Sequence, residues 1–486
     1  MTNSKVSITR NVLYNWLRVG LSLVFPLITT PYLTRVLGTE GIGKVNYIYS
    51  ITSYFAAFAT LGISDYAIKE GGKIRDDPEK LGKFATEMFI LNLIATGLAS
   101  VAFFSLLFIP SLNVYSTLII IMYIHIPAGA LGLLWIFQVF EDYKRITLFS
   151  TVIQLISVAL MFILVRSKDD YLNYAFVHVF SSVSVNFICF FSIRKQLKLF
   201  GYGNYELIKH LKPILIIFAL GIAASLYLNF DTTMLGTMIG DDSVGLYYIS
   251  VKLVNMVEKI MTSISGVLLA RLSYYVGSAK TREFDDLVKK TISCILIIAI
   301  PAAIGLFCLA EPTVLLIGGP GFLLSARSLR VLCFKIVFST LNGFLVYQIL
   351  LPLNKEKISA LATIISCVVN LGLNYLIIPV LEETGAAITT VLAELCVFII
   401  CIYAARSVIK RISLWGTIFK LFLAAIQIPI VSVIVFKLTD SILLRLVIPI
   451  GLCVPMYFGL LYLLKEPVVM YYTNRVFKKL SPQNDL

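Results

Sequence analysis

The chain has 486 residues, of which 58% are hydrophobic and only 14% are charged, and its mean hydropathy is +0.89. This composition excludes a soluble globular protein, whose core does not need so much apolar surface. The net charge of +14 would suit a nucleic-acid-binding protein, but the lysines and arginines fall on alternate connectors between apolar stretches. A distribution of this kind argues against nucleic acid and in favour of a membrane.

Fourteen apolar stretches are long enough to cross a bilayer, because a hydrocarbon core of about 30 Å needs about 20 helical residues. Lipid offers no partner for an unpaired backbone group, so we expect these stretches to be α-helices. The sequence therefore predicts an all-α polytopic membrane protein with about 14 transmembrane helices. In chain order they span residues 11–34, 45–68, 85–108, 117–139, 147–165, 174–193, 213–230, 243–270, 291–310, 326–350, 359–380, 387–404, 416–436 and 442–464.

The basic residues predict how these helices are oriented. With the N-terminus in the cytoplasm, the connectors and tails on that side carry 28 of the 41 lysines and arginines, and the opposite connectors carry 5. This asymmetry follows the positive-inside rule and predicts that both termini are cytoplasmic. The first 20 residues contain Lys5, Arg10 and Arg18 and run directly into the first span, which argues against a cleavable signal peptide.

Two segments at an offset of 202 residues resemble each other. Within Leu37–Gly43 and Ile239–Gly245 the matched pairs are Gly38 with Gly240, Glu40 with Asp242, and Gly43 with Gly245. A second match, at an offset of 210, pairs Phe137-Gln138 with Tyr347-Gln348. These offsets predict two parallel six-helix repeats, the arrangement of many transporters. We expect a first lobe of residues 1–210, a second lobe of residues 211–414, and an additional helix pair with a cytoplasmic tail at residues 415–486.

Other features limit the function. The chain has no GxxxxGK[ST] loop, so we do not expect ATP to drive it, and its eight cysteines lie in apolar spans without CxxC spacing, which favours packing over disulfides or a metal site. No cofactor is expected. Spans thirteen and fourteen either pack against lipid or form a lateral groove for a lipid tail.

Several scattered segments within about residues 8–405 carry a family resemblance: Asn11 to Gly43 with Pro31–Gly38, Trp135–Gln138 followed by Glu141, Asp231–Gly236 leading to Gly245–Tyr248, and Asn370–Tyr375 with Ile378-Pro379 and Gly385–Ala387. Together they resemble the Wzx-type polysaccharide and O-antigen flippases, in the superfamily that also contains MATE exporters and MurJ-type lipid II flippases. The additional helix pair resembles the MurJ-type arrangement.

The resemblance implies a flippase in the bacterial plasma membrane. Its substrate would be an undecaprenyl-pyrophosphate-linked oligosaccharide, moved from the cytoplasmic to the external leaflet by alternating access in exchange for an ion. It further implies that the protein is a monomer among membrane lipids, with a polysaccharide polymerase and chain-length proteins as partners, and not an enzyme.

Cations inside the spans are candidates for binding the pyrophosphate, because Lys and Arg stabilise a compact anion where water is scarce. Lys252 and Lys259 share a helix face with Asn255 between them, and Lys335 lies near the middle of its span. Arg18 and Arg271 lie nearer the helix ends, where snorkelling and lipid headgroup binding are alternatives. The predicted substrate site is therefore Arg18, Lys252, Asn255, Lys259, Arg271 and Lys335.

Oxygen-bearing side chains at one depth in the second repeat predict a coupling site for Na⁺ or H⁺. These residues are Asp231, Asn370, Asn374, Thr390 and Glu394. In the alternative interpretation Asp231 caps a helix and Glu394 pairs with a lysine such as Lys335. His125 and His178 have no evident acid partner and are interpreted as packing residues, and His210 lies in a basic connector.

Three other functions remain open. A lipid II flippase would share the fold. A MATE-like exporter of organic cations would need carboxylates and aromatics in the first repeat, where this chain has Arg18. A membrane glycosyltransferase or polymerase would need paired carboxylates or a large external loop, and the external connectors are short.

Overall fold

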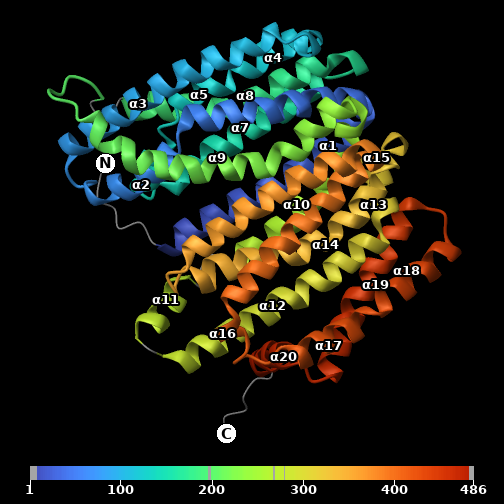
Figure 1. Cartoon of the computed structure of the whole chain (residues 1–486). Coiled ribbons are helices and arrows are strands. Elements are labelled where there is room, and N and C mark those ends of the chain that lie inside the picture. The colour runs from blue at the N-terminus through green and yellow to red at the C-terminus, as the bar shows by residue number, and fades with distance from the viewer. Residues whose placement is uncertain (1–7, 195–196, 198, 266–268, 279, 481–486) are drawn as a thin grey trace. The chain divides into compact units, whose positions relative to one another are not determined.

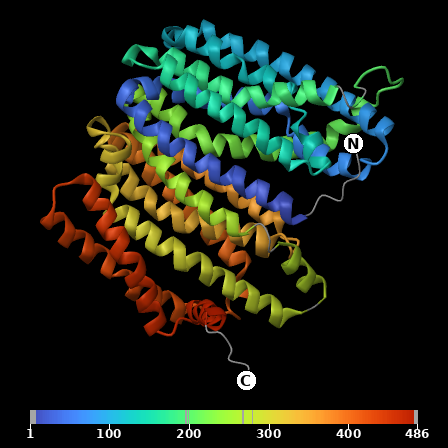
Figure 2. The ribbon, with the colours of Figure 1, turned by 180° about the vertical axis from the view of Figure 1, so that it is seen from behind.

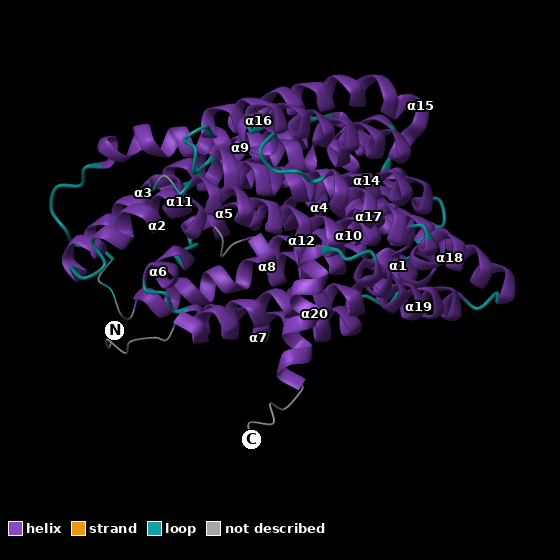
Figure 3. Cartoon of the chain, turned by 90° about the horizontal axis from the view of Figure 1, so that it is seen from below, coloured by secondary structure: helices purple, strands orange, loops and turns teal. Residues whose placement is uncertain are grey.

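The computed structural model describes residues 8–194, 197, 199–265, 269–278 and 280–480, and within these residues every regular element is a helix (Figures 1, 2 and 3). The chain forms two compact units, Met1–Gly245 and Leu246–Leu486. The all-α fold expected from the sequence is confirmed, and the lobe boundaries 1–210, 211–414 and 415–486 stay a prediction.

The described residues of the first unit form nine α-helices, three 3₁₀-helices (η1 to η3) and the start of a tenth α-helix. They are α1 (Ile8–Thr60), α2 (Ile63–Lys73), α3 (Pro78–Phe104), η1 (Ser105–Phe108), η2 (Pro110–Tyr115), α4 (Ser116–Tyr123), α5 (His125–Ala130), α6 (Leu134–Val139), α7 (Tyr143–Leu164), η3 (Lys168–Asp170), α8 (Tyr171–Arg194), α9 (Leu207–Met238) and α10 (Asp241–Ser265).

The second unit continues α10 and adds the remaining helices of the described chain. They are α11 (Leu269–Gly277), α12 (Thr281–Cys308), α13 (Ala310–Ile317), η4 (Pro320–Phe322), α14 (Ser325–Phe344), the π-helix η5 (Leu345–Leu350), α15 (Glu356–Ala404), α16 (Arg406–Ile409), α17 (Trp415–Ala425), α18 (Gln427–Leu438), α19 (Ile442–Leu463) and α20 (Pro467–Leu480).

Ten helical stretches of the described residues are long and apolar enough to cross a membrane: 78–108, 110–130, 143–164, 168–194, 207–238, 281–308, 325–350, 356–404, 415–438 and 442–463. Helix α15 has 49 residues and loses helical geometry at Glu382, whose φ is 50°. At 1.5 Å per residue it is long enough for two crossings. Helix α1, with 53 residues, breaks in the same way at Gly38. The two breaks fall where the sequence predicts a boundary between spans, and the count of fourteen stays a prediction.

Local sequence signals explain several helix ends. Asp77 accepts a hydrogen bond from the Lys80 backbone N–H at 3.1 Å, and Pro78 follows as the first residue of α3. This hydrogen bond lowers the pKa of Asp77 below its usual value. Asp142 caps α7 in the same way through the backbone N–H of Arg145. Side-chain caps of this type satisfy backbone N–H groups that the helix leaves unpaired.

The two turns that resemble each other in sequence lie against each other in the first unit. A Cβ atom on Gly43 would overlap the backbone of Asp241, and one on Gly245 would overlap the backbone of Thr39. Since Thr39 corresponds to Asp241 and Gly43 to Gly245 under the offset of 202, the two contacts are equivalent, as in a two-fold interface. The Thr39 hydroxyl also donates to Asp242. The geometry therefore supports the repeat inferred from these turns.

The core of the first unit contains the tryptophan segment that carries part of the family resemblance. Trp135 and Phe137 of α6 are buried among α2 and α3, where Phe84 packs edge-on against Trp135 at a centroid distance of 5.8 Å. Gly71 of α2 approaches the Trp135 ring so closely that a Cβ atom would lie 3.0 Å from it. This packing fixes α2, α3 and α6 to one another and positions the polar cluster described below.

Candidate functional site

The second unit contains a cavity of about 510 Å³ whose lining is entirely apolar. It lies among α12, α14, α15 and α17, so it joins the predicted second repeat to the additional helix pair. Phe307, Phe334 and Phe422 line it and are 41%, 57% and 54% exposed, which means that the cavity reaches the surface of the protein. A cavity without polar groups binds hydrocarbon better than a sugar or a phosphate.

An ion pair lies on two helices of the same unit. Lys335 of α14 donates to Glu258 of α10 at 3.2 Å, and the Ser339 hydroxyl donates to the other carboxylate oxygen at 2.5 Å. The Lys335 and Glu258 side chains are only 13% and 16% exposed. The alternative in which Lys335 pairs with Glu394 is therefore wrong. Glu258 is the ion-pair partner of Lys335 because α10 and α14 bring the two side chains together. The sequence did not reveal this pairing.

The other predicted substrate-binding cations are spread along α10 and beyond it. Lys252 is half-buried with its ammonium 5.4 Å from the centre of the Tyr248 ring, whereas Lys259 is exposed and Asn255 is half-buried. Arg271 of α11 is exposed and donates to Tyr275 at 2.9 Å. The side chain of Arg18 lies outside the described part of the structure, and a common site for these residues stays a prediction.

Two of the predicted coupling residues are in direct contact. Within α15 the Asn374 amide donates to Asn370 at 3.2 Å, and the hydroxyl of Thr389 donates to Asn374. Thr390 shares a hydrogen bond of 3.0 Å with Tyr247. Asn370 and Asn374 are buried, which places two amide groups and one hydroxyl together without solvent.

Glu394 has a partner that the sequence did not suggest. The Asn342 amide of α14 donates to the Glu394 carboxylate at 2.7 Å and to its backbone carbonyl at 2.9 Å. Both side chains are buried. Because Asn342 is a lone amide in an apolar span, it could have been identified by the same reasoning that identified Asn374.

Asp231 belongs to the first unit and lies in the interior of a helix. It lies inside α9, which continues to Met238, and it is buried. Asp231 therefore does not lie at the end of its helix, as the alternative interpretation assumed, because α9 extends past the predicted end of the seventh span. Asp231 lies in the first unit. The other predicted coupling residues, Asn370, Asn374, Thr390 and Glu394, lie in the second unit.

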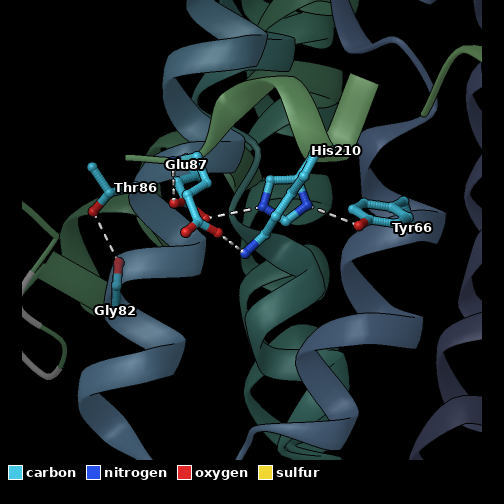
Figure 4. Close-up of polar contacts among 7 residues, drawn as sticks. Tyr66, Gly82, Thr86, Glu87 and His210 are labelled. Atoms are coloured by element: carbon cyan, nitrogen blue, oxygen red, sulfur yellow. Dashed lines mark hydrogen bonds and ion pairs between the residues drawn. The ribbon is translucent and has the colours of Figure 1, made fainter. Parts of the chain in front are cut away.

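A second polar cluster lies in the first unit, at the start of α9 (Figure 4). The ring of His210 lies between Tyr66 of α2 and Glu87 of α3, with Nδ1 at 2.8 Å from the Tyr66 hydroxyl and Nε2 at 3.0 Å from Glu87. The backbone N–H of Glu206 donates to the other Glu87 oxygen at 2.9 Å. His210 was expected in a connector, but it lies in the first turn of α9 and is buried.

Two further histidines of the first unit are neighbours. His125 of α5 and His178 of α8 have ring centroids 5.7 Å apart, and the Tyr49 ring of α1 lies within 5.6 Å and 4.8 Å of them. Their interpretation as packing residues agrees with these ring contacts. Sequence spacing could not reveal the cluster, since its three members come from different helices.

The family model described as polysaccharide biosynthesis protein matches residues 8–276, and the MatE model matches residues 213–376. The chain is 25% identical over 407 residues to the "Putative O-antigen transporter" of Escherichia coli (strain K12), covering 81% of this chain and 95% of that protein. It is 20% identical over 202 residues to the "Probable low-salt glycan biosynthesis flippase Agl15" of Haloferax volcanii, covering 42% of this chain and 40% of that protein.

Solved structures show the same fold. The lipid II flippase MurJ in an inward closed conformation matches with a TM-score of 0.75 at 14% identity, covering 96% of this chain and 100% of that chain. An inward-facing MATE family multidrug transporter matches with a TM-score of 0.63 at 16% identity, covering 80% of this chain and 95% of that chain. The chain therefore belongs to the polysaccharide biosynthesis protein family and has the fold of the MATE and MurJ superfamily, as the resemblance in its sequence predicted.

Proposed function

We propose that the protein is a flippase that moves an undecaprenyl-pyrophosphate-linked oligosaccharide from the cytoplasmic to the external leaflet of the plasma membrane. The observation that carries this proposal is the wholly apolar cavity of the second unit, which reaches the protein surface. A polyprenyl chain can lie there while its polar head group stays elsewhere. An exporter of small polar solutes has no use for such a lining.

The head group of this substrate is an anion, and the cations of α10 and α14 are its proposed ligands. Lys335 is mostly buried beside Glu258, and Lys252 and Lys259 lie on the same helix as Glu258. A phosphate oxygen could replace Glu258 at the Lys335 ammonium, because both are anionic acceptors. Arg18 and Arg271 remain candidates at the helix ends, and Asn255 is a candidate for contact with the sugar.

The driving force is proposed to be an ion gradient. The buried amide and hydroxyl oxygens of Asn370, Asn374 and Thr389 suit a hard cation such as Na⁺, whereas Glu394 suits a proton. Asp231 and Thr390 remain candidates for the same role. With both termini in the cytoplasm, as the basic connectors predict, these groups lie in the outer half of the membrane.

The proposal is tested with the full chain in proteoliposomes that contain a labelled undecaprenyl-pyrophosphate oligosaccharide in one leaflet. We expect the label to reach the other leaflet at a rate that depends on an Na⁺ or proton gradient. The variant V337F, which fills the cavity, should slow transfer at least about tenfold, a change of about 1.4 kcal/mol in activation free energy. The matched control V433F alters a valine that is 54% exposed on α18 and should leave the rate unchanged.

Failure of transfer in the wild-type liposomes, or equal rates for V337F and V433F, contradicts the proposal. Lipid II is tested in the same liposomes as the alternative substrate, because both lipids share the polyprenyl pyrophosphate and differ in the head group attached to it. If lipid II were transferred faster, lipid II would become the proposed substrate, and the proposed role of the cavity would stay the same.

A further inference from the structure

The apolar cavity of the second unit has two different ends. Ile292 and Phe307 of α12 both line it, so it extends along this helix for about 22 Å, at 1.5 Å per residue. Ile409 and Leu414, from the segment after α15, line one end, which we call the connector end. A ligand whose hydrocarbon chain lies in the cavity leaves its head group outside the apolar lining. The charges at the two ends therefore decide where that head group binds.

The connector end is attached to the first turns of α12. Arg411 donates to both carboxylate oxygens of Asp285, at 2.6 and 2.8 Å, and to the Ser407 carbonyl at 2.8 Å. Asp285 lies about two helical turns before Ile292, where the cavity lining of α12 begins. Arg411 therefore holds the segment after α15 beside this end of the cavity, while its own charge is already paired with Asp285.

Cations without an acidic partner surround the connector end. The segment of residues 405–414 contains Arg406, Lys410 and Arg411 and no acidic residue. Arg406 and Lys410 are exposed, and so is Lys290 of α12, two residues before Ile292. In the part of the chain that the structure describes, no carboxylate pairs with Arg406, Lys410 or Lys290. Their charges are therefore available to an anion.

The opposite end of the cavity has less free charge. Phe307 and Phe334 meet there, with ring centroids 6.1 Å apart. Arg330, one turn before Phe334, lies 3.7 Å from the Glu311 carboxylate and is thereby paired. The connector end is therefore the better place for an anionic head group.

Exposed aromatic rings place the connector end at the membrane surface. Trp415, the first residue of α17, is 82% exposed, and Tyr403, near the end of α15, is 65% exposed. Tryptophan and tyrosine are enriched at the level of the lipid head groups. The Arg406 guanidinium lies 4.4 Å from the centre of the Tyr403 ring, which restricts its rotamers and so lowers the entropy lost when it binds an anion.

We propose that the connector end is a binding site for the diphosphate group of a polyprenyl lipid, held by Arg406 and Lys410 while the chain lies in the cavity. This site rests on the proposed function and gives the head group a position before it reaches the cations of α10 and α14. The distribution of basic residues predicts that the segment after α15 is cytoplasmic, and the proposed substrate starts in the cytoplasmic leaflet.

The number of free cations favours a diphosphate over an ordinary phospholipid. A polyprenyl diphosphate has two adjacent anionic phosphates at the end of one hydrocarbon chain, so both Arg406 and Lys410 have a phosphate to bind. A phosphodiester lipid has a single phosphate charge and leaves one of these cations without a partner. Lys290 adds to the positive field at the same end.

The test is equilibrium binding of radiolabelled farnesyl diphosphate to the purified full chain in detergent. Farnesol has the same chain without the diphosphate, and we expect it to compete at least about tenfold less well. Inorganic diphosphate lacks the chain and should also compete at least about tenfold less well. Added salt should weaken the binding of farnesyl diphosphate, because it screens the exposed cations.

The variants R406Q and K410Q each remove one cation and should weaken the binding of farnesyl diphosphate by about three- to tenfold. The binding of labelled farnesol should stay the same in both variants. The matched control K437Q removes an exposed lysine at the end of α18 and should bind farnesyl diphosphate as the wild type does. V337F, which fills the cavity, should weaken the binding of both ligands.

Equal binding of farnesyl diphosphate by R406Q, K410Q and K437Q would overturn the proposal. Displacement of the label by phosphatidylglycerol as efficient as by unlabelled farnesyl diphosphate would also overturn it, because the site would then bind ordinary phospholipids. Transfer in proteoliposomes is a separate measurement. Normal transfer together with unchanged binding in R406Q and K410Q would keep the flippase function and remove this site, whereas charge-dependent binding without transfer would keep the site and remove the flippase function.

Discussion

The two units bury different chemistry. The first unit joins its helices by the hydrogen bonds of His210 with Tyr66 and Glu87, and by the close approach of the turns at Gly43 and Gly245. The second unit has an apolar cavity of about 510 Å³, and its helix α14 makes polar contacts with α10 and α15. The first unit therefore fills its interior with packed and hydrogen-bonded side chains, whereas the second unit leaves an apolar hollow that the proposed function assigns to a hydrocarbon chain.

The largest expected effect is in the second unit, at the ion pair. K335M leaves the Glu258 carboxylate mostly buried without its cation and should destabilise the protein by about 3–5 kcal/mol. The double variant E258Q/K335M should recover most of this loss, because it removes both charges. Thermal unfolding of the purified proteins measures the difference. A double variant as unstable as K335M would show that the pair does not act as a unit.

A second substitution, N342A, removes the amide that donates to Glu394. N342A deletes two hydrogen bonds, one of them to a buried carboxylate, and should cost about 1.5–3 kcal/mol. The control is S432A, since that buried hydroxyl only donates to the Ile428 carbonyl of its own helix. The free energies of unfolding in denaturant should therefore differ between the two variants. Equal values would mean that Asn342 contributes no more than an ordinary hydroxyl.

In the first unit the paired turns leave no room for a side chain. G43A and G245A each force a Cβ atom into the opposite backbone and should cost about 1–3 kcal/mol, as overpacking does. G97A, in a stretch of α3 where a Cβ atom would meet nothing, should be neutral or slightly stabilising. Unfolding midpoints compare the three variants. Similar midpoints for all of them would show that the two turns do not touch.

The smallest effect is expected at the ion pair between the start of α12 and the segment that follows α16. Arg411 donates to both oxygens of Asp285, at 2.6 and 2.8 Å, and this hydrogen bonding raises the pKa of Arg411. Because the Arg411 side chain is 43% exposed, D285N should cost less than about 1 kcal/mol, and less still at high salt. A loss comparable to that of K335M would erase the contrast between water-exposed and membrane-buried pairs.

Most of the fold could be predicted from the sequence, and much less of the candidate site. Apolar length alone predicted an all-helical membrane fold, and the offset between Gly38 and Gly240 pointed to two turns that are in contact in the structure. Among the predicted site residues, Asn370 and Asn374 are bonded to each other, and Thr389, which the sequence analysis did not single out beside Thr390, donates to Asn374. A shift of one residue turns a helical side chain by about 100°, which is too fine for span boundaries known only to a few residues.

The sequence by itself determined that this chain lies in a membrane. Backbone N–H and C=O groups in lipid must be paired within helices, and the side chains of helices that face lipid must be apolar, which is the pattern of this sequence. It also determined the family, since short motifs are local. Only the tertiary structure decided which polar groups meet: Lys335 with Glu258, Asn342 with Glu394, and His210 with Tyr66 and Glu87. Each of these contacts joins residues of different helices that lie at least 52 positions apart in the chain. The relative position and rotation of those helices come from packing, which helical periodicity does not encode.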